Sequence, residues 1–180
     1  VFPHHENEIA QSEGSTKKKF VNYWFHNEHL LVNGQKMSKS LGNFYTLRDL
    51  LGKGYNPKAI RYLLLSANYR VQLNFTEEAV KAAENAVQRR DNFIKKIRIF
   101  KKVFKKREQN PEIQKLIKKT QMEFAKKMDD DLNISEALAV IFDFIRDINT
   151  KMVPEGIDKR DAQEVYDFMM KINSILGVID

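Results

Sequence analysis

The sequence has 180 residues, of which 42% are hydrophobic, so it can bury one sizeable core or two small ones and is not a largely disordered chain. It contains no cysteine, which excludes disulfide bonds, and it has no apolar run long enough to cross a bilayer. Because 31 lysine and arginine residues face 24 aspartate and glutamate residues, the net charge is +7, which favours polyanionic partners such as nucleic acid or phosphorylated ligands.

The N-terminal segment begins with Val1 and has neither the basic region nor the apolar stretch of a signal peptide. We therefore expect a piece of a longer cytoplasmic protein that is monomeric and does not act at a membrane. Pro3 suits the first turn of a helix, and the residues that follow predict a short helix that ends at Gly14. The aromatic and β-branched stretch FVNYWFH at 20–26 predicts a strand.

The next stretch predicts a tight hairpin. Asn33 and Gly34 lie between HLLV and QKM, and Asn-Gly between such runs is the strongest short-range hairpin signal. The motif KMSKS, from Lys36 to Ser40, then lies in the loop that leaves the hairpin.

Two short helices are predicted after this loop. Thr46, with Asp49 three residues later, is typical of a helix N-cap. Asn56 caps a second helix that has Pro57 at its first position and one apolar face, formed by Ile60, Leu63 and Leu64.

From Thr76 onward the chain has almost no glycine or proline, and its apolar residues recur every three or four positions. This pattern predicts four amphipathic helices in an antiparallel bundle, the third of them starting at Asn133 with Glu136 completing a capping box. Arg90 interrupts the apolar stripe of the first helix, which extends to Phe104, and VPEG at 153–156 predicts the last turn. We predict a mainly α protein divided into residues 1–45, 46–75 and 76–180.

Lys36 and Lys39 are the first candidates for chemistry. Together with the serine hydroxyls between and beside them, they present two ammonium groups and hydroxyl donors to a phosphate chain, while Met37 anchors the loop to the body. Such a loop stabilises the charge that develops on a triphosphate. A merely solvated loop is the alternative.

His4 and Glu8 are four residues apart, so on a helix they face the same way and are candidates for binding one cation. A solvated pair is the alternative. The three aspartates of MDDDLN at 128–133 predict a helix-capping turn rather than a metal site. The helix from Lys81 to Arg107 is rich in lysine and arginine, and is either a solvated face or one that lies along a nucleic-acid backbone.

These residues also carry a resemblance. KMSKS matches the second signature of class I aminoacyl-tRNA synthetases, and FPHHENEIAQSE with KMSKSLGNF resembles the cysteinyl-tRNA synthetases. The stretch MDDDLNISEALAVIFDFI at 128–145 resembles the helical domain of that family. The resemblance covers essentially the whole chain and implies the end of a Rossmann-like α/β catalytic domain in 1–45, connecting helices in 46–75 and a tRNA-binding bundle in 76–180.

The resemblance implies ATP-dependent ligation of cysteine to tRNA(Cys) through a cysteinyl-adenylate, with Mg²⁺ accompanying ATP. Lys39 would be the ATP-contacting lysine, with Lys36 assisting on the phosphates. The family holds a zinc ion, Zn²⁺, through two cysteines, a histidine and a glutamate, and His4 and Glu8 match the last two. This chain contains neither cysteine and no string like the first class I signature, so we expect it to be inactive alone.

Two other functions stay open from the sequence. The cysteine ligase of mycothiol biosynthesis resembles the same family, including its zinc motif, but needs no tRNA, and the basic helix argues mildly against it. A non-catalytic helical RNA-binding module, in which the lysine loop merely contacts phosphates, is the second.

Overall fold

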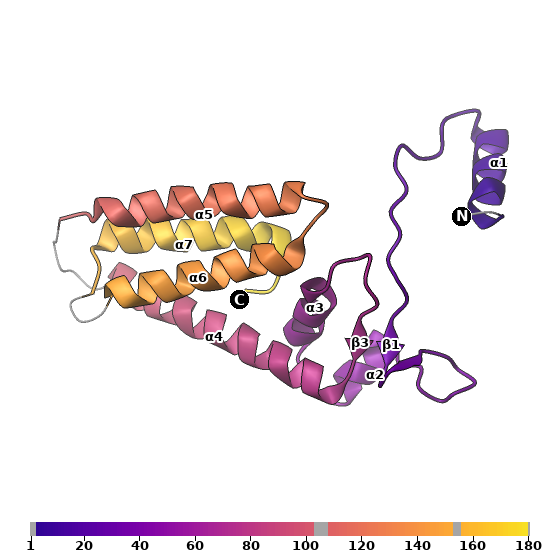
Figure 1. Ribbon diagram of the computed structural model, residues 1–180, viewed down its shortest axis with the longest axis horizontal. Helices are drawn as coiled ribbons and strands as arrows, with labels where there is room; N and C mark the ends of the chain where they lie inside the picture. Colours follow the sequence, from indigo (N-terminus) through magenta and orange to yellow (C-terminus); the bar gives the residue numbers. More distant parts are fainter. Residues whose placement is uncertain (1–2, 103–107, 153–155, 180) are drawn as a thin grey trace.

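The computed structural model describes residues 3–102, 108–152 and 156–179, and the chain is mainly helical there, as predicted. The elements follow in this order: α1 (His4–Thr16), β1 (Leu31–Val32), β2 (Gln35–Lys36), α2 (Leu47–Gly52), α3 (Pro57–Ser66), β3 (Asn74–Phe75), α4 (Glu77–Lys102), α5 (Pro111–Asp129), α6 (Ile134–Met152) and α7 (Lys159–Leu176). Figure 1 shows α5, α6 and α7 side by side at one end and α1 standing apart at the other. None of the described helices combines the length and the apolar composition that crossing a bilayer requires.

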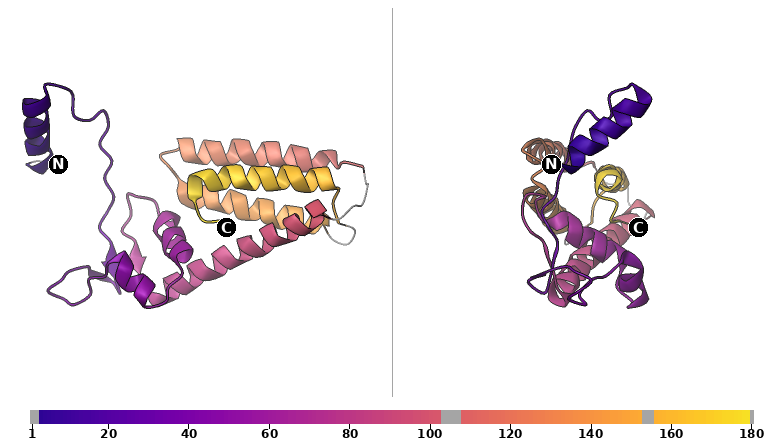
Figure 2. Two further views of the ribbon diagram at one scale, coloured as in Figure 1. Left: turned by 180° about the vertical axis from the view of Figure 1, so that it is seen from behind. Right: turned by 90° about the vertical axis from the view of Figure 1, so that its right-hand side faces the viewer.

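The helices α4 to α7 form the predicted antiparallel bundle, because successive helices run in opposite directions (Figures 1 and 2). Side chains fix two of the helix starts: Asn110 accepts a hydrogen bond from the Glu112 N–H at 3.0 Å, and Asp158 accepts one from the Arg160 N–H at 2.8 Å. Completely buried apolar side chains from all four helices share one core: Ile97, Ile113, Ala137, Ile148, Ala162, Val165 and Met169. This core holds the bundle together.

The long helix α4 takes part in two cores. Near its C-terminal end Phe93 and Ile97 belong to the core of the bundle. Near its start Val80 and Ala83 pack in a second, smaller core that includes residues of α2, α3, β1 and β3: Val32, Leu50, Ala59, Ile60, Leu63 and Phe75. The helix α4 therefore belongs to both packed parts of the chain, and the division into domains stays a prediction.

Arg90 lies in the apolar stripe of α4, where it is buried although it is charged. Its side chain is only 4% exposed, and its guanidinium donates a hydrogen bond to the carbonyl of Val178, in the segment after α7. Burial lowers the pKa of Arg90, but the neighbouring carboxylate of Asp91, 3.4 Å away, favours the charged form. Arg90 thus ties the C-terminal segment to the bundle.

A small sheet and two short helices lie at the other end of α4. The strands are in the order β2-β1-β3; β1 pairs antiparallel with β2 and parallel with β3. Thr46 and Asn56 cap α2 and α3 as predicted. The prediction for the apolar face of α3 is wrong at one position, since Ile60 and Leu63 are buried but Leu64 is 50% exposed.

The N-terminal region departs from two predictions. The first helix does not end at Gly14 but continues to Thr16, because one glycine costs a helix only about 1 kcal/mol relative to alanine. The predicted strand at 20–26 is extended but is not paired with another strand among the described residues, and Tyr23 is 93% exposed. A strand needs a hydrogen-bonding neighbour, and the described sheet begins only at Leu31.

Two further predictions lie outside the described residues. Phe104, at the end of the predicted stripe of α4, is one of them. The turn at 153–156 is the other, of which only Gly156 is described, with a positive φ of 79°.

Candidate functional site

The predicted hairpin is present and holds the lysine motif. Val32 pairs with Gln35 and Leu31 with Lys36, and both turn residues have the positive φ that such a turn needs, 51° at Asn33 and 75° at Gly34. The Gly34 N–H also donates to the Asn74 side chain at 2.8 Å. The turn of the hairpin is thus held on β3, and the motif begins at Lys36, the last residue of β2.

The loop from Lys36 to Ser40 presents both lysines to solvent. The side chains of Lys36 and Lys39 are exposed, whereas Met37 is half-buried and packs against the smaller core. Met37 therefore anchors the loop as expected, and the two ammonium groups stay accessible to a ligand.

Contacts within the loop limit its conformations. The Ser38 and Ser40 hydroxyls lie 2.7 Å apart, and the Gly42 N–H donates to the Lys39 carbonyl at 3.2 Å. The ammonium of Lys39 lies 5.4 Å from the centre of the Phe44 ring, at the range of a cation–π contact. The Lys39 side chain is thus held by a weak contact and stays exposed.

Sequence reasoning missed Asn43, which closes this loop. Its Nδ2 donates to the Lys36 carbonyl at 3.2 Å, and its Oδ1 accepts a hydrogen bond from the Ser38 N–H at 2.8 Å. An amide side chain offers both a donor and an acceptor, which a loop closure of this kind needs. The signal was an asparagine placed directly after a glycine at the far side of the motif.

A capping box starts α2 shortly after the loop. The Thr46 hydroxyl accepts from the Asp49 N–H at 3.2 Å, and the Asp49 carboxylate accepts from the Thr46 N–H at 2.7 Å. The hydroxyl and the N–H of Thr46 hold the pKa of Asp49 below its ordinary value. The charged carboxylate fixes the point at which the loop ends.

His4 and Glu8 lie one turn apart on α1, and both are exposed. The neighbouring His5 stacks on both Trp24 and His26, with its ring centre 4.3 Å from that of Trp24 and 4.7 Å from that of His26. This stack holds α1 against the extended segment. Among the described residues no group of three histidine or acidic side chains is placed to hold a metal ion.

The structure does not bring the two candidate pairs together. Figures 1 and 2 show α1 at one end of the extended segment and the loop that follows β2 at the other. Lys36 and Lys39 therefore form one candidate site, and His4 and Glu8 a separate one.

The acidic turn at 128–133 is a helix-terminating turn, as predicted. Asp129 ends α5, and the Asn133 side chain accepts a hydrogen bond from the Glu136 N–H at the start of α6. Asp131 accepts hydrogen bonds at 2.6 Å from both the Tyr69 hydroxyl and the Arg70 Nε. The turn thus ties the bundle to the segment that follows α3.

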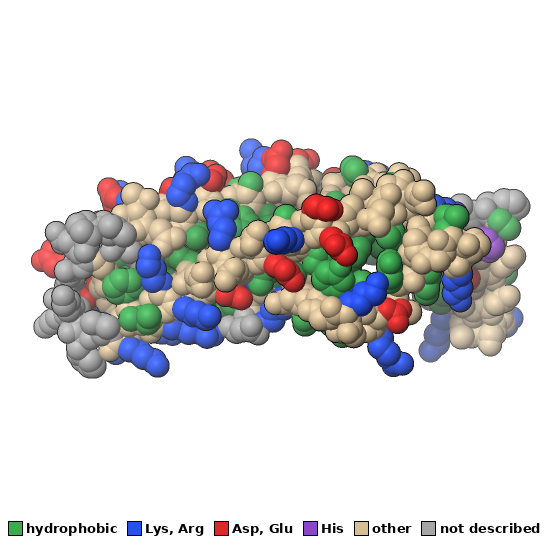
Figure 3. Space-filling view, turned by 90° about the horizontal axis from the view of Figure 1, so that it is seen from below, with side chains coloured by type: hydrophobic (Ala, Val, Ile, Leu, Met, Phe, Trp, Pro, Cys, Tyr) green, Lys and Arg blue, Asp and Glu red, His purple; other side chains and the backbone are tan. Residues whose placement is uncertain are grey.

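The basic helix α4 exposes many cations. Its exposed lysine and arginine side chains are Lys81, Arg89, Lys95, Lys96, Arg98 and Lys102. From residue 85 to 102 its one acidic residue, Asp91, is half-buried beside Arg90. Figure 3 shows Lys and Arg side chains recurring along this side of the molecule, interspersed with acidic ones.

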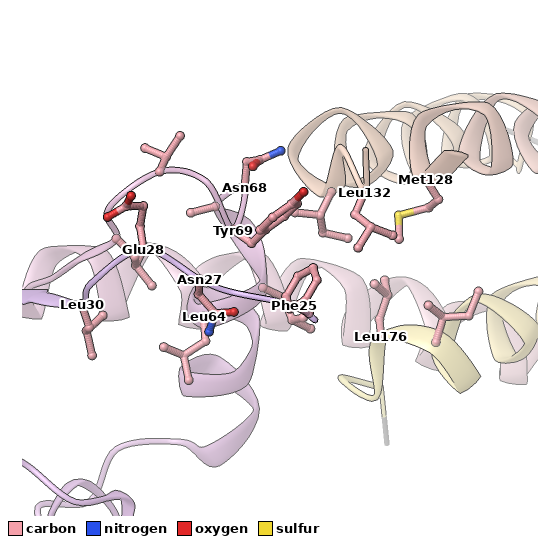
Figure 4. Close-up of a pocket in the computed structure, with 16 residues that line it drawn as sticks. Phe25, Asn27, Glu28, Leu30, Leu64, Asn68, Tyr69, Met128, Leu132 and Leu176 are labelled. Carbon is pink, nitrogen blue, oxygen red and sulfur yellow. The ribbon is translucent and has the colours of Figure 1, made fainter. Parts of the chain in front are cut away.

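An apolar pocket of about 520 Å³ lies where the extended segment, α3 and the bundle meet. Figure 4 shows Phe25 and Tyr69 on one side of it and Met128, Leu132 and Leu176 on the other. It includes none of the four predicted site residues. It is separate from the lysine loop and from the candidate metal ligands.

Comparison with known proteins places these features in a family. Residues 1–85 match the model of the catalytic domain of class I (C) tRNA synthetases, and residues 123–180 match the DALR domain. The chain is 48% identical over 179 residues to the cysteine--tRNA ligase of Protochlamydia amoebophila, a match that covers 99% of the chain and 37% of the relative. This chain belongs to the class I aminoacyl-tRNA synthetases.

Two further relatives bear the same name. The synthetase chain is 46% identical to the cysteine--tRNA ligase of Chlamydia muridarum over 187 residues, with 99% of the chain and 39% of the relative covered. It is 45% identical to the cysteine--tRNA ligase of Brachyspira hyodysenteriae over 176 residues, with 98% of the chain and 36% of the relative covered. The chain thus spans less than two-fifths of the length of these three relatives.

The two family matches cover different parts of this synthetase chain and leave residues 86–122 in neither. The hairpin, the lysine loop, α2 and α3 lie within the match to the catalytic domain, which ends at residue 85, inside α4. The helices α6 and α7 and the end of α5 lie within the DALR match. The loop with Lys36 and Lys39 is therefore part of a catalytic domain.

Proposed function

We propose that this chain is part of an enzyme that ligates cysteine to tRNA(Cys) with ATP, through a cysteinyl-adenylate. The observation that carries the proposal is the exposed lysine loop, anchored on a hairpin inside a class I catalytic-domain match. The name shared by the three relatives, each at least 45% identical to the chain, supports the choice of cysteine.

In the first step the cysteine carboxylate attacks the α-phosphorus of ATP, and the bond to the bridging oxygen breaks to release pyrophosphate. Negative charge accumulates on the departing phosphates. Lys39 contacts these phosphates and Lys36 assists it, so both stabilise the charge where it develops. In the second step a hydroxyl of the 3′-terminal ribose of the tRNA attacks the cysteinyl carbonyl, and AMP leaves. Mg²⁺ enters with ATP as part of that substrate.

A resident zinc ion does not fit the donors that this chain provides. Protein zinc sites use three or four protein ligands, whereas α1 offers His4 and Glu8, and no third histidine or acidic side chain joins them among the described residues. The sequence contains no cysteine to complete the set. We assign His4 and Glu8 as two ligands of a site that this chain alone does not complete, and we route no step through the metal.

The basic side of α4 is proposed to lie along the tRNA. Exposed lysines and arginines release counterions from phosphates and contribute sequence-independent, salt-sensitive affinity. Replacing Lys95 and Lys102 by alanine should weaken tRNA binding and make it less dependent on salt concentration. The same double variant should form cysteinyl-adenylate normally, because the first step does not involve tRNA.

We expect the chain by itself to be inactive, since it has no string like the first class I signature. The cytoplasmic location and the monomeric state stay predictions from the sequence. The test therefore uses a full-length protein that contains this chain and measures cysteine-dependent exchange between ATP and pyrophosphate.

The decisive variant is Lys39→Ala, with Lys81→Ala as its control, because Lys81 is an exposed lysine on α4 outside the loop. Lys39→Ala should lower the exchange rate by about a hundredfold or more, since it removes a charge that stabilises the transition state. Lys81→Ala should leave the rate unchanged, and serine should not replace cysteine.

The same assays separate the other functions. Ligation of cysteine to an amino sugar instead of tRNA would identify the ligase of mycothiol biosynthesis. RNA binding without any cysteine-dependent exchange would identify a non-catalytic binding module. Exchange that is unaffected by Lys39→Ala would contradict the role of the loop.

A further inference from the structure

One side chain, that of Asn43, links the far end of the lysine loop to two points near its start. Asn43 donates from Nδ2 to the Lys36 carbonyl at 3.2 Å and accepts at Oδ1 from the Ser38 N–H at 2.8 Å. From a position four residues after Lys39, it therefore holds the backbone on either side of Met37. The loop is closed from its far end by a residue that lies outside the KMSKS motif.

Asn43 has no role in starting the next helix. The N-cap of α2 is Thr46, and its capping box with Asp49 is complete. The side chain of Asn43 is half-buried and turned back toward the loop, where it makes its hydrogen bonds to Lys36 and Ser38. Its two contacts therefore serve the loop rather than the helix.

The hydrogen bonds of Asn43 limit the positions that the Lys39 ammonium can reach. The Gly42 N–H bonds to the Lys39 carbonyl at 3.2 Å, and Gly42 has a positive φ of 67° that directs the chain back to Asn43. With the backbone fixed on both sides, the Lys39 side chain moves through its own torsions, from the Phe44 ring toward a bound phosphate. A loop without this closure would spread the ammonium over many positions.

We propose that Asn43 is a positioning residue for ATP: by bonding to Lys36 and Ser38 it sets the loop geometry from which Lys39 reaches the phosphates. The inference rests on the proposed function of the loop. It extends the group of residues that serve the first step to a side chain whose two hydrogen bonds go to the protein backbone.

The test measures cysteine-dependent exchange between ATP and pyrophosphate in a full-length enzyme that contains this chain. Asn43→Ala removes both hydrogen bonds, and Asn43→Asp keeps the shape and the acceptor but loses the donor to Lys36. Both variants should lower kcat/KM for ATP by about tenfold to a hundredfold, because small displacements of a positioning loop have effects of this size. The KM for cysteine should stay within about twofold, as no contact of Asn43 is directed at that substrate. Asn85→Ala, at an exposed position on α4, is the matched control and should behave as wild type.

A double-mutant cycle shows whether Asn43 acts through Lys39. In the Lys39→Ala background, Asn43→Ala should have little further effect on the exchange rate, because the group that it positions is absent. Equal and additive losses in both backgrounds would overturn the proposal, as would a loss that falls on ATP and cysteine alike.

The outcomes also separate this inference from the proposed function. If Lys39→Ala lowers the exchange rate and Asn43→Ala leaves it within about twofold of wild type, the inference fails and the function of the loop stands. If Lys39→Ala has no effect, or the wild type shows no exchange, the proposed function of the loop fails, and the inference fails with it.

Discussion

The bundle buries aromatic and apolar side chains, whereas the N-terminal region leaves large ones exposed. Helix α7 buries residues along one whole face, among them Val165, Phe168 and Met169, whereas α1 buries none. The segment after α1 leaves Tyr23 93% exposed and Phe25 60% exposed. Both regions have the composition of folded protein, so the difference lies in whether a partner surface is present among the described residues.

The comparison also shows how stability is distributed along the chain. The bundle has one core built by four helices, while α1 is held by stacking of His5 on Trp24 and His26. Stacked ring pairs contribute about 0.5–1.5 kcal/mol each, far less than a complete core. We therefore expect the two regions to open independently.

Hydrogen exchange gives the largest expected difference. Amides of α6 should exchange only through global unfolding, which costs about 5–15 kcal/mol, and those of α1 through local opening at a cost near zero. The ratio of their exchange rates should be at least about a thousandfold, measured by mass spectrometry on the chain. Equal protection of α1 and α6 would show that α1 belongs to a cooperative unit with the bundle.

Two isoleucines on α4 differ in burial within one helix. Ile97 is fully buried in the core of the bundle, and Ile99 is 60% exposed. Ile97→Ala should lower the free energy of unfolding by about 2–5 kcal/mol, since it removes buried methyl groups and leaves a cavity. Ile99→Ala should change it by no more than about 0.5 kcal/mol. Urea denaturation of both variants measures this.

Comparable losses in the two isoleucine variants would mean that the exposed side of α4 is also covered. This outcome would point to association between copies of the chain, which the dependence of the urea midpoint on protein concentration would reveal.

The sequence predicted the bundle well and the N-terminal region poorly for a physical reason. Apolar periodicity reports which face of a helix is buried, and the partners of α5, α6 and α7 are present in the same chain. The stretch at 20–26 has the residues of a strand, but no periodicity states which neighbour it pairs with. The burial of Arg90 could not be predicted either, because its hydrogen-bond partner is the Val178 carbonyl, far away in the sequence.

The candidate site was predictable in its charges and not in its geometry. The motif directly gave Lys36 and Lys39, and the Asn-Gly turn gave the loop that carries them. Asn43 was missed because hydrogen bonds between a side chain and the backbone in a loop have no sequence period. The role of Asp131 was missed because its partners, Tyr69 and Arg70, lie in the segment after α3, far from Asp131 in the sequence.

Replacing two glycines by alanine should have smaller effects on stability, of opposite sign at the two positions. Gly177 ends α7 at a positive φ of 65°, and an added Cβ would lie 2.9 Å from Nε of Arg61, which donates to the Leu176 carbonyl. Gly14 lies inside α1 with nothing within 4 Å of an added Cβ. Gly177→Ala should lower the free energy of unfolding by about 1–2 kcal/mol.

Gly14→Ala should instead slow hydrogen exchange in α1, because alanine favours a helix by up to about 1 kcal/mol over glycine. It should leave the global free energy of unfolding unchanged, since α1 buries no residue. A global change caused by Gly14→Ala would show that the two regions are coupled after all.

Asp131 gives the smallest effect, because it is an exposed link between the two parts of the chain. Hydrogen bonds from Arg70 and Tyr69 hold the pKa of Asp131 below its ordinary value of 3.8. The folded state therefore binds this proton more weakly than the unfolded state does. The resulting stability is present above the unfolded pKa and is lost as the pH falls through the lower, folded pKa.

Asp131→Asn should accordingly melt at a slightly lower temperature than wild type near pH 6, and the difference should shrink as the pH falls below 3.8, toward the folded pKa. Asp130→Asn is the control, since Asp130 caps α5 through its backbone N–H and its side chain is exposed. Melting temperatures measured across this range should therefore show a difference that depends on pH for Asp131→Asn alone. A difference that is constant with pH would mean that Asp131 stabilises the turn through the two acceptor oxygens that bind Tyr69 and Arg70, and not through its charge.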